Sequence, residues 1–346
     1  FSSHLPPMTT PIKTYLPLFA ALTLLLPVSG EAVTMTELLD TNGIPTPVVY
    51  GTNDPSIQII VPFVPPDRKQ GEKRPALVLI HGGAWHAPGA SLFYPMAKYF
   101  ASRGVPTFSI DYRGIQKETN GVGIPEIVSD CRAAMRYLRT HAAEYGIDSD
   151  KIAVLGDSAG GHLAACLGTI SDPQDADGVS SAANLMIPCN PIVEMGPGEG
   201  NTNSWFRLIQ KGAAMERKPT AEAIMPTAEQ IAVAKSVSPM ACVSSKSAPA
   251  LVIHGLDDFV VSPEQSRKFA ESLKAAGVPV ELVLIPGARH AFILPKYTAT
   301  EQQVVDTMIT IDRFLAKNGY MTGEPTLVVS ATPAWEPRGK SAPKPT

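Results

Sequence analysis

The chain has 346 residues, of which 44% are hydrophobic and 18% are charged, and its formal net charge is −3. This composition is typical of a globular protein with a large core, and it excludes a chain that stays unfolded for lack of apolar residues. Because there is no basic excess, we expect no nucleic-acid partner. No C-x-x-C pair and no histidine-rich cluster indicates a metal site.

Residues 1–32 are typical of an export signal with a short extension in front of it. The apolar stretch Tyr15–Val28 is too short for a transmembrane helix. Gly30 and Ala32 are small residues at the −3 and −1 positions of a cleavage site after Ala32. We therefore expect a mature, exported chain that starts near Val33, is periplasmic or extracellular and has no stable membrane insertion. The alternative is a membrane anchor that is never cut.

Segments typical of strands and helices alternate from about residue 46 to residue 318. Repeated βα units of this kind predict an α/β fold, with a mostly parallel sheet and helices on both faces. Apolar runs and helical periodicity predict strands at Val48–Tyr50, Ile57–Pro62, Ala76–Ile80, Pro106–Ile110, Lys151–Leu155, Leu185–Pro188, Ala250–Ile253 and Val280–Ile285, and helices at Ser91–Ser102, Pro125–Glu144, Gly161–Leu167, Thr227–Val237, Pro263–Gly277 and Thr300–Lys317.

The main domain is expected over residues 33–320. Within it, residues 192–240 are too long for a loop in a compact domain, and we interpret them as a small helical cap over the carboxyl ends of the strands. A peripheral decoration is the alternative. Ser262 and Gln265 form the pattern of a capping box before the next helix. Residues 321–346 are rich in proline and predict a disordered tail, in which only Leu327–Val329 favours a strand.

Four cysteines are compatible with disulfides in an exported chain. Cys131 and Cys166 fall inside predicted helices, where buried free thiols are common. Cys189 and Cys242 flank the predicted cap and are the better candidate pair, although their spacing does not establish that the two Cα atoms approach.

The most informative motif is Gly156-Asp157-Ser158-Ala159-Gly160. A buried strand precedes it and a helix follows it, so the serine lies at the apex of a tight turn. Gly156 and Gly160 stand where a side chain would collide with the neighbouring backbone. This context is that of the nucleophile elbow of an α/β-hydrolase, and it assigns Ser158 as a nucleophile.

A serine nucleophile needs a base, and the base needs an acid that orients it. In α/β-hydrolases the acid and then the histidine follow the serine along the chain. His290 is the one histidine after the last predicted strand, so we assign it as the general base. The acid is assigned to Asp258, which follows a buried strand; its neighbour Asp257 is the competitor.

The tetrahedral intermediate needs amide donors for its oxyanion. We expect one from Ala159, directly after the nucleophile, and others from Gly83 and Ala84 in the loop after the strand Ala76–Ile80. Gly82 is a further candidate donor if the loop register differs. Candidate residues of the substrate pocket are Trp85, which is equally a candidate for packing, Asp157 and Trp205.

Several motifs in this order resemble those of carboxylesterases of the hormone-sensitive-lipase-like branch, and look closest to bacterial acetylxylan and feruloyl esterase-like proteins. The resemblance covers roughly residues 70–318. It implies hydrolysis of short-chain carboxylic esters without metal or organic cofactor, with a small-molecule or saccharide ester as substrate; acetylated plant polysaccharide rests on the resemblance alone. The motifs are His81-Gly82-Gly83-Ala84-Trp85, Asp111-Tyr112-Arg113, Tyr145-Gly146-Ile147-Asp148, Gly156–His162, and the stretches around Asp258 and His290.

One departure from that family pattern concerns the pocket. Residues 114–121 stand between Asp111-Tyr112-Arg113 and the pair Pro125-Glu126, which usually follows sooner in the relatives. We therefore expect the alcohol or acyl side of the pocket to differ.

Two other functions fit the same residues. A serine peptidase of the prolyl-oligopeptidase type shares the fold, the order of the triad and the stretch His254–Asp258. A non-catalytic binding protein on this fold is the second alternative, against which the intact set of serine, aspartate and histidine argues. Acyl chain length and oligomeric state are not indicated by the sequence.

Overall fold

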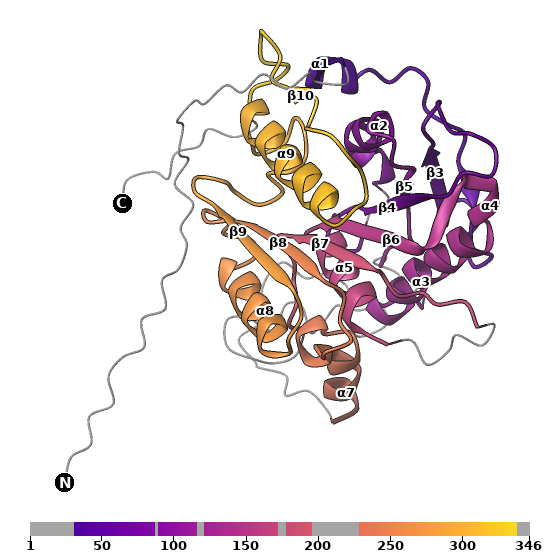
Figure 1. The fold of residues 1–346 in the computed structure, drawn as a ribbon. Helices are drawn as coiled ribbons and strands as arrows, with labels where there is room; N and C mark the ends of the chain where they lie inside the picture. Colours follow the sequence, from indigo (N-terminus) through magenta and orange to yellow (C-terminus); the bar gives the residue numbers. More distant parts are fainter. Residues whose placement is uncertain (1–30, 87–88, 116–120, 172–177, 196–227, 338–346) are drawn as a thin grey trace, which may run out of the picture.

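The computed structural model describes residues 31–86, 89–115, 121–171, 178–195 and 228–337 (Figure 1). Within these residues an eight-stranded sheet has the order β2-β3-β5-β4-β6-β7-β8-β9. The first two pairings are antiparallel and the others are parallel. The strands are β2 (Val48–Val49), β3 (Ile59–Phe63), β4 (Arg74–Ile80), β5 (Thr107–Ile110), β6 (Ile147–Asp157), β7 (Leu185–Cys189), β8 (Ala250–Gly255) and β9 (Val280–Ile285).

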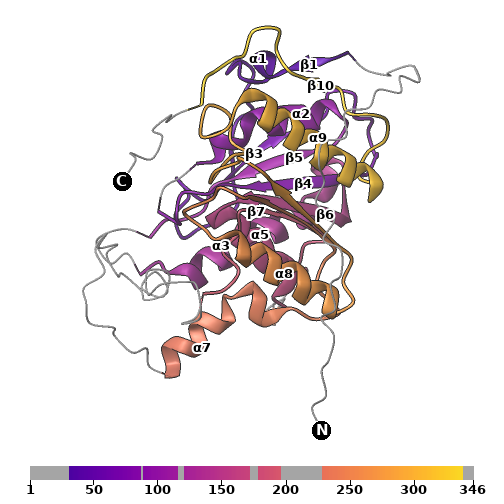
Figure 2. The same cartoon turned by 90° about the vertical axis from the view of Figure 1, so that its left-hand side faces the viewer.

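Helices cover both faces of this sheet (Figure 2). One face packs against α2 (Tyr94–Ser102) and α9 (Glu301–Lys317), and the other against α3 (Ile124–Thr140), α5 (Ala159–Thr169) and α8 (Pro263–Ala275). Burying one leucine or valine side chain contributes roughly 1.5–3 kcal/mol, so two such cores stabilise the sheet from both sides. The predicted α/β architecture is confirmed.

Alternate side chains of the central strand β4 pack into the two hydrophobic cores on opposite faces of the sheet. Val78 packs with the α3, α5 and α8 side, whereas Leu77 and Leu79 pack with the α2 and α9 side. Successive side chains of a strand point to opposite faces, so a strand buried on both faces must be apolar throughout. This explains why the run Ala76–Ile80 shows no polar alternation.

The predicted strands and helices are confirmed with small shifts at their ends. The helix expected from Ser91 starts as a 3-10 turn, η1 (Ala90–Phe93), before α2. The single helix expected over 125–144 ends at Thr140, and a short helix, α4 (Ala142–Tyr145), follows His141. Gly146 ends α4 in the left-handed conformation at φ 64°.

The two described ends of the chain lie side by side. β1 (Val33–Thr34), which leads into α1 (Met35–Leu38), pairs in parallel with β10 (Leu327–Val328). The buried carboxylate of Glu301 accepts the amides of Ser330 and Ala334, and the indole of Trp335 donates to the Ala299 carbonyl.

The prediction of a disordered tail is therefore wrong for residues 321–337. A proline-rich segment stays disordered only where no contacts hold it to the domain. Here the buried side chain of Leu327, which is 3% exposed, and the buried acceptor Glu301, which is 2% exposed, hold the segment in place. Residues 338–346 lie outside the described residues.

The interval predicted to form a cap is described only at its ends. Ile192 and Val193 at its start are buried, α7 (Ala228–Ser236) matches the helix expected there, and η2 (Pro239–Cys242) follows. Residues 196–227, including Trp205, lie outside the described residues. None of the described helices is long and apolar enough to cross a membrane.

The capping box predicted at the start of α8 forms only in part. The Ser262 hydroxyl accepts the Glu264 amide, as an N-cap does. The side chain of Gln265 turns inward instead and accepts the amides of Val193 and Glu194. It therefore ties α8 to the start of the cap interval.

The disulfide considered between Cys189 and Cys242 is absent, and all four cysteines are free thiols. Cys189 lies in the core on the α9 side of the sheet. The Cys242 thiol instead contacts the Lys235 carbonyl, and its neighbours Met240 and Val243 pack against the core on the opposite side, which contains Cys166 of α5. The two sulfurs thus lie on different faces, where no bridge can form.

Candidate active site

Ser158 lies at the turn between β6 and α5, as predicted. It has φ 57° and ψ −118°, a sparsely populated conformation for a residue with a side chain. Holding one residue in such a region costs about 1–3 kcal/mol, and such strain clusters at functional sites. Its amide donates to the Cys189 carbonyl at 2.9 Å, which fixes the turn against the end of β7.

The glycines around Ser158 allow the backbone segments to approach closely. A Cβ on Gly156 would lie 2.1 Å from the Gly160 carbonyl oxygen, and one on Gly160 would lie 1.9 Å from the Ile80 carbonyl oxygen. No side chain fits at either position. The collision expected from the motif is confirmed, and it explains why α5 can start directly beside β4.

The three predicted catalytic side chains meet at the carboxyl edge of the parallel sheet. His290 Nε2 lies 2.8 Å from Ser158 Oγ, and His290 Nδ1 lies 2.7 Å from Asp258 Oδ2. They come from the loops that follow β6, β8 and β9, which end at the same edge. The competitor Asp257 is exposed and its amide donates to the Ala288 carbonyl, so of the two neighbours Asp258 is the carboxylate that contacts His290.

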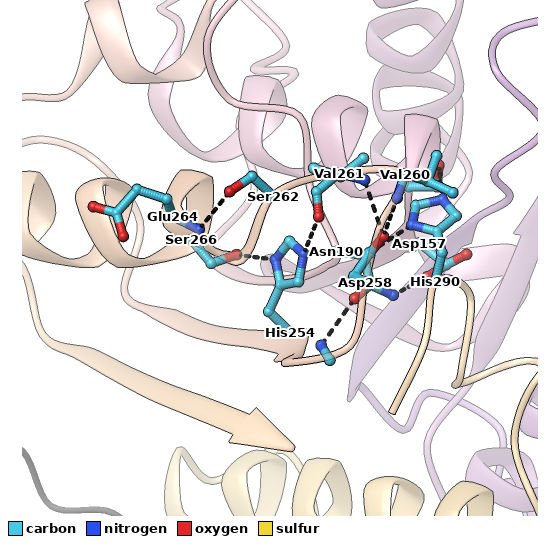
Figure 3. A network of polar contacts seen from close by, with 12 residues as sticks. Asp157, Asn190, His254, Asp258, Val260, Val261, Ser262, Glu264, Ser266 and His290 are labelled. Atoms are coloured by element: carbon cyan, nitrogen blue, oxygen red, sulfur yellow. Dashed lines mark hydrogen bonds and ion pairs between the residues drawn. The ribbon is translucent and has the colours of Figure 1, made fainter. Parts of the chain in front are cut away.

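Both oxygens of the Asp258 carboxylate accept hydrogen bonds (Figure 3). Oδ1 accepts the amides of Val260 and Val261 at 2.8 and 2.9 Å. Burial favours the neutral acid, but hydrogen bonds from His254, His290 and Val261 outweigh it and hold the pKa of Asp258 well below its usual range. Asp258 is therefore a charged carboxylate at neutral pH.

The environment of His290 favours its protonated form. Burial alone lowers the pKa of this imidazole, whereas the hydrogen bond to Asp258 and the charges of Asp157 and Asp258 raise it, with a net rise above its usual value. This arrangement stabilises an imidazolium cation at His290.

Asp157 is a second buried carboxylate beside the triad. It is 1% exposed, and burial raises its pKa to about 6. Its Oδ1 accepts the side-chain amide of Asn190 at 3.0 Å (Figure 3). Asp157 was a candidate for the substrate pocket, but its carboxylate is buried within the protein, so the structure does not support that role.

The loop predicted to supply the oxyanion donors has an unusual backbone. Gly83, Ala84 and Trp85 all have positive φ, at 104°, 51° and 59°. Within the described residues, neither the Gly83 nor the Ala84 amide donates to a protein acceptor. Ala159 is the first residue of α5, where amides have no intrahelical acceptor. The donor roles of these three residues remain a prediction.

Polar contacts of the buried residues His81 and Tyr112 support this loop. The His81 ring lies 2.7 Å from the Gly82 carbonyl through Nδ1 and 2.9 Å from Asp111 Oδ1 through Nε2. It also stacks on Tyr112, whose hydroxyl donates to the His81 carbonyl. His81 therefore supports the loop from within the core.

Trp85 packs inside the protein rather than facing solvent. Its side chain is 0% exposed and its indole N–H donates to His162 Nδ1 at 3.3 Å. His162 in turn contacts the Val237 carbonyl at 2.7 Å. Of its two expected roles, packing is the one that these contacts support. The third pocket candidate, Trp205, lies outside the described residues.

Three polar residues beside the triad escaped the sequence analysis. His254 and Ser266 contact one another next to Asp258, and Asn190 bridges Asp157 and the Gly255 amide. His254 has a sequence signal, because it lies four residues before the acid. Asn190 has a weaker one, as a polar residue directly after a buried parallel strand. No group of histidine, cysteine or carboxylate side chains in the described residues could hold a metal.

The fold is that of the α/β-hydrolase class, and the array of serine, histidine and aspartate lies where that fold holds its nucleophile. The sequence profile of the BD-FAE family matches residues 63–273, and that of the dienelactone hydrolase family matches residues 233–315. Because the first match spans more than half of the chain, the protein belongs to the BD-FAE family. The resemblance to esterases with this fold is confirmed, whereas the acetylxylan esterase-like branch is not.

Similar proteins are carboxylic ester hydrolases. Esterase LipQ of Mycobacterium tuberculosis is 29% identical over 235 residues, covering 66% of this chain and 53% of that protein. Esterase LipC of the same organism is 32% identical over 224 residues, covering 64% and 53%. This chain thus spans about half the length of the curated relatives it matches.

One solved esterase structure is similar to this chain over nearly the whole length of that esterase. Native esterase 2 of Thermogutta terrifontis is 30% identical, with a TM-score of 0.67, covering 81% of this chain and 94% of that one. The same esterase with propionate bound gives a TM-score of 0.68, at 30% identity, covering 82% of this chain and 98% of that one.

The buried charge of Asp157 should lower the stability of the folded protein at neutral pH, and this can be tested. Its folded pKa of about 6 exceeds the unfolded value of about 3.9, so the folded state binds more protons and loses stability as pH rises from 4 through 6. Asp157→Asn should therefore raise the free energy of unfolding at pH 7.5 by up to roughly 3 kcal/mol, and by nothing below about pH 4.

Urea unfolding at pH 4, 5.5 and 7.5 measures this difference. The exposed neighbour serves as a control, since Asp257→Asn should leave stability unchanged at all three pH values. A variant at position 157 that is equally stable as the wild type at pH 7.5, or less stable, would contradict the buried charge.

Proposed function

We propose that this protein hydrolyses short-chain carboxylic esters through an acyl-enzyme, using Ser158, His290 and Asp258. The observation that carries the proposal is the continuous hydrogen-bonded array from the serine hydroxyl through the imidazole to a charged carboxylate, at 2.8 and 2.7 Å. Its geometry is that of an activated serine nucleophile.

In the first half of the proposed reaction, Ser158 Oγ attacks the ester carbonyl carbon while its proton passes to His290 Nε2. Asp258 accepts the Nδ1–H and stabilises the imidazolium cation. The carbonyl oxygen becomes an oxyanion, which amides of Gly83, Ala84 and Ala159 would bind. The C–O bond to the alcohol then breaks, and the alcohol leaves with the proton from His290.

In the second half, a water molecule replaces the alcohol. His290 takes a proton from this water as its oxygen attacks the acyl carbon of the acyl-enzyme. Collapse of the second tetrahedral intermediate breaks the bond to Ser158 Oγ, which recovers the proton from His290. The acid leaves and the triad returns to its starting state.

We propose that the substrates of this site are esters with short acyl groups. The support comes from the similar Thermogutta terrifontis esterase 2, of which structures with propionate and with butyrate bound are known. The motif resemblance to acetylxylan esterase-like proteins adds acetyl esters of plant polysaccharide as the proposed natural class. A serine peptidase is the alternative that the triad alone leaves open.

Removing the nucleophile should abolish the reaction. Ser158→Ala should lower kcat for p-nitrophenyl acetate by at least about 10⁴-fold, because it removes the hydroxyl that contacts His290 Nε2 and would form the acyl-enzyme. Circular dichroism should stay unchanged. A fluorophosphonate should label the wild type and the exposed-serine control Ser180→Ala, but not the variant. Activity near that of the wild type would refute the assignment.

The acyl preference should appear in a panel of p-nitrophenyl esters from acetate to octanoate. We expect kcat/KM to be highest for acetate to butyrate and to fall by at least about tenfold at octanoate, since one methylene in a pocket is worth about 1–3 kcal/mol. Acetylated xylan and a dipeptide amide complete the panel. Preference for the amide would favour the peptidase, and preference for octanoate would refute the short pocket.

We also propose that the protein is exported. The apolar stretch Tyr15–Val28 and the small residues before Val33 support this, and Val33 is the first residue of β1. Protein recovered from outside the cytoplasm should have an N-terminal sequence beginning at Val33, as Edman sequencing can determine. Full-length protein confined to the cytoplasm would refute the proposal.

A further inference from the structure

We propose that His254 and Ser266 form a buried positioning pair for Asp258, which extends the triad to a chain of five residues. The proposal rests on the esterase function proposed above and adds two residues to it. Neither belongs to the nucleophile, the base or the acid, and both are 0% exposed. The chain runs Ser266, His254, Asp258, His290, Ser158.

His254 contacts the same carboxylate oxygen as the catalytic histidine. Its Nε2 lies 3.3 Å from Asp258 Oδ2, the oxygen that also binds His290 Nδ1 at 2.7 Å. With the two backbone amides on Oδ1, each oxygen of Asp258 faces two donors. A carboxylate with four hydrogen-bond partners cannot rotate freely, so its orientation toward His290 is fixed.

The contacts of His254 determine which ring nitrogen carries the proton. Nε2 faces two groups that can only accept: the Asp258 carboxylate and, at 3.0 Å, the Val261 carbonyl. Nε2 must therefore be protonated. Nδ1 lies 2.6 Å from the Ser266 hydroxyl, which can donate (Figure 3). In the neutral ring, Ser266 O–H donates to Nδ1 and so stabilises the tautomer that donates toward Asp258.

The fold supplies both partners without relying on a flexible loop. His254 is in β8 and Ser266 is in the first turns of α8, so two regular elements support the acid-bearing loop between them. Residues supported in this way hold a site more precisely than residues on loops do. His254 and Ser266 therefore act through Asp258 and do not themselves touch the reacting atoms.

Loss of the pair should have a distinct kinetic signature. Without the donor at His254, more of the Asp258 charge acts on His290, which also faces Asp157 across the site. The cationic form of His290 should gain stability, and the acidic limb of kcat/KM should move to higher pH. Because Asp258 also becomes mobile, kcat should fall while KM for the ester stays unchanged.

Three substitutions at these two positions test this with p-nitrophenyl acetate and the full-length protein. Ser266→Ala should lower kcat about tenfold, and His254→Leu should lower it more. His254→Gln keeps an N–H donor near the position of Nε2 and should recover most of the activity lost in His254→Leu. The matched control is Ser262→Ala on the same helix, which loses only an N-cap contact to the Glu264 amide and should keep wild-type kcat and pH profile.

The outcomes separate a positioning role from a structural one. If Ser266→Ala keeps the wild-type kcat and acidic limb, the proposal is overturned. It is also overturned if kcat falls without any shift of the limb, or if His254→Gln is as poor as His254→Leu. Should His254→Leu fail to fold, Ser266→Ala and His254→Gln still decide the question.

An independent measurement does not depend on ester turnover. ¹⁵N chemical shifts of histidine-labelled wild-type protein report the tautomer of each ring. We expect a His254 signal that is protonated at Nε2, with an Nδ1 shift that changes in Ser266→Ala because the hydroxyl donor to Nδ1 is lost. A His254 ring protonated only at Nδ1 would overturn the proposal. Absence of fluorophosphonate labelling and of ester turnover in the wild type would instead refute the proposed esterase function.

Discussion

The structure depends on one steric constraint, which is the close approach of α5 to the backbones of β4 and β7. A Cβ on Gly160 would lie 1.9 Å from the Ile80 carbonyl oxygen, and one on Gly161 would lie 2.5 Å from the Cys189 carbonyl oxygen. Only glycine fits there. Because α5 can start at this point, Ser158 is forced into a strained turn at the edge of the sheet, and its hydroxyl points to where the loops after β8 and β9 converge.

The parallel arrangement of the strands explains why residues so far apart in sequence meet at Ser158. Ligand sites in open α/β sheets lie beyond the carboxyl ends of the strands. The strand order β6-β7-β8-β9 brings the ends that carry Ser158, Asn190, Asp258 and His290 together in sequence order. The amide of Asn190 donates to the Ile253 carbonyl and its side chain contacts both β6 and β8, so it connects adjacent strand ends.

The sequence predicted the elements and the triad because each carries a local signal, such as the glycines beside Ser158 or the position of His290 after the last strand. What it could not supply depends on the spatial neighbours of a residue. Trp85 is a pocket candidate until the structure shows its indole against His162. Cys189 and Cys242 look paired in sequence, but lie on opposite faces of the sheet. The tail after residue 320 is proline-rich, yet Glu301 and β1 bind it, and neither partner is near it in sequence.

Two carboxylates beside one histidine are pushed in opposite directions by their surroundings. Asp258 faces four donors, and its pKa falls although burial opposes this. Asp157 accepts a hydrogen bond from Asn190, and burial raises its pKa to about 6. The contrast distinguishes the two: the carboxylate rich in donors stays charged and contacts His290, and the other favours its neutral form up to about pH 6. The donors around Asp258 are therefore part of how its charge acts on His290. A donor that is removed from Asp258, such as His254, changes how strongly the remaining charge stabilises the imidazolium, even though no catalytic atom has moved.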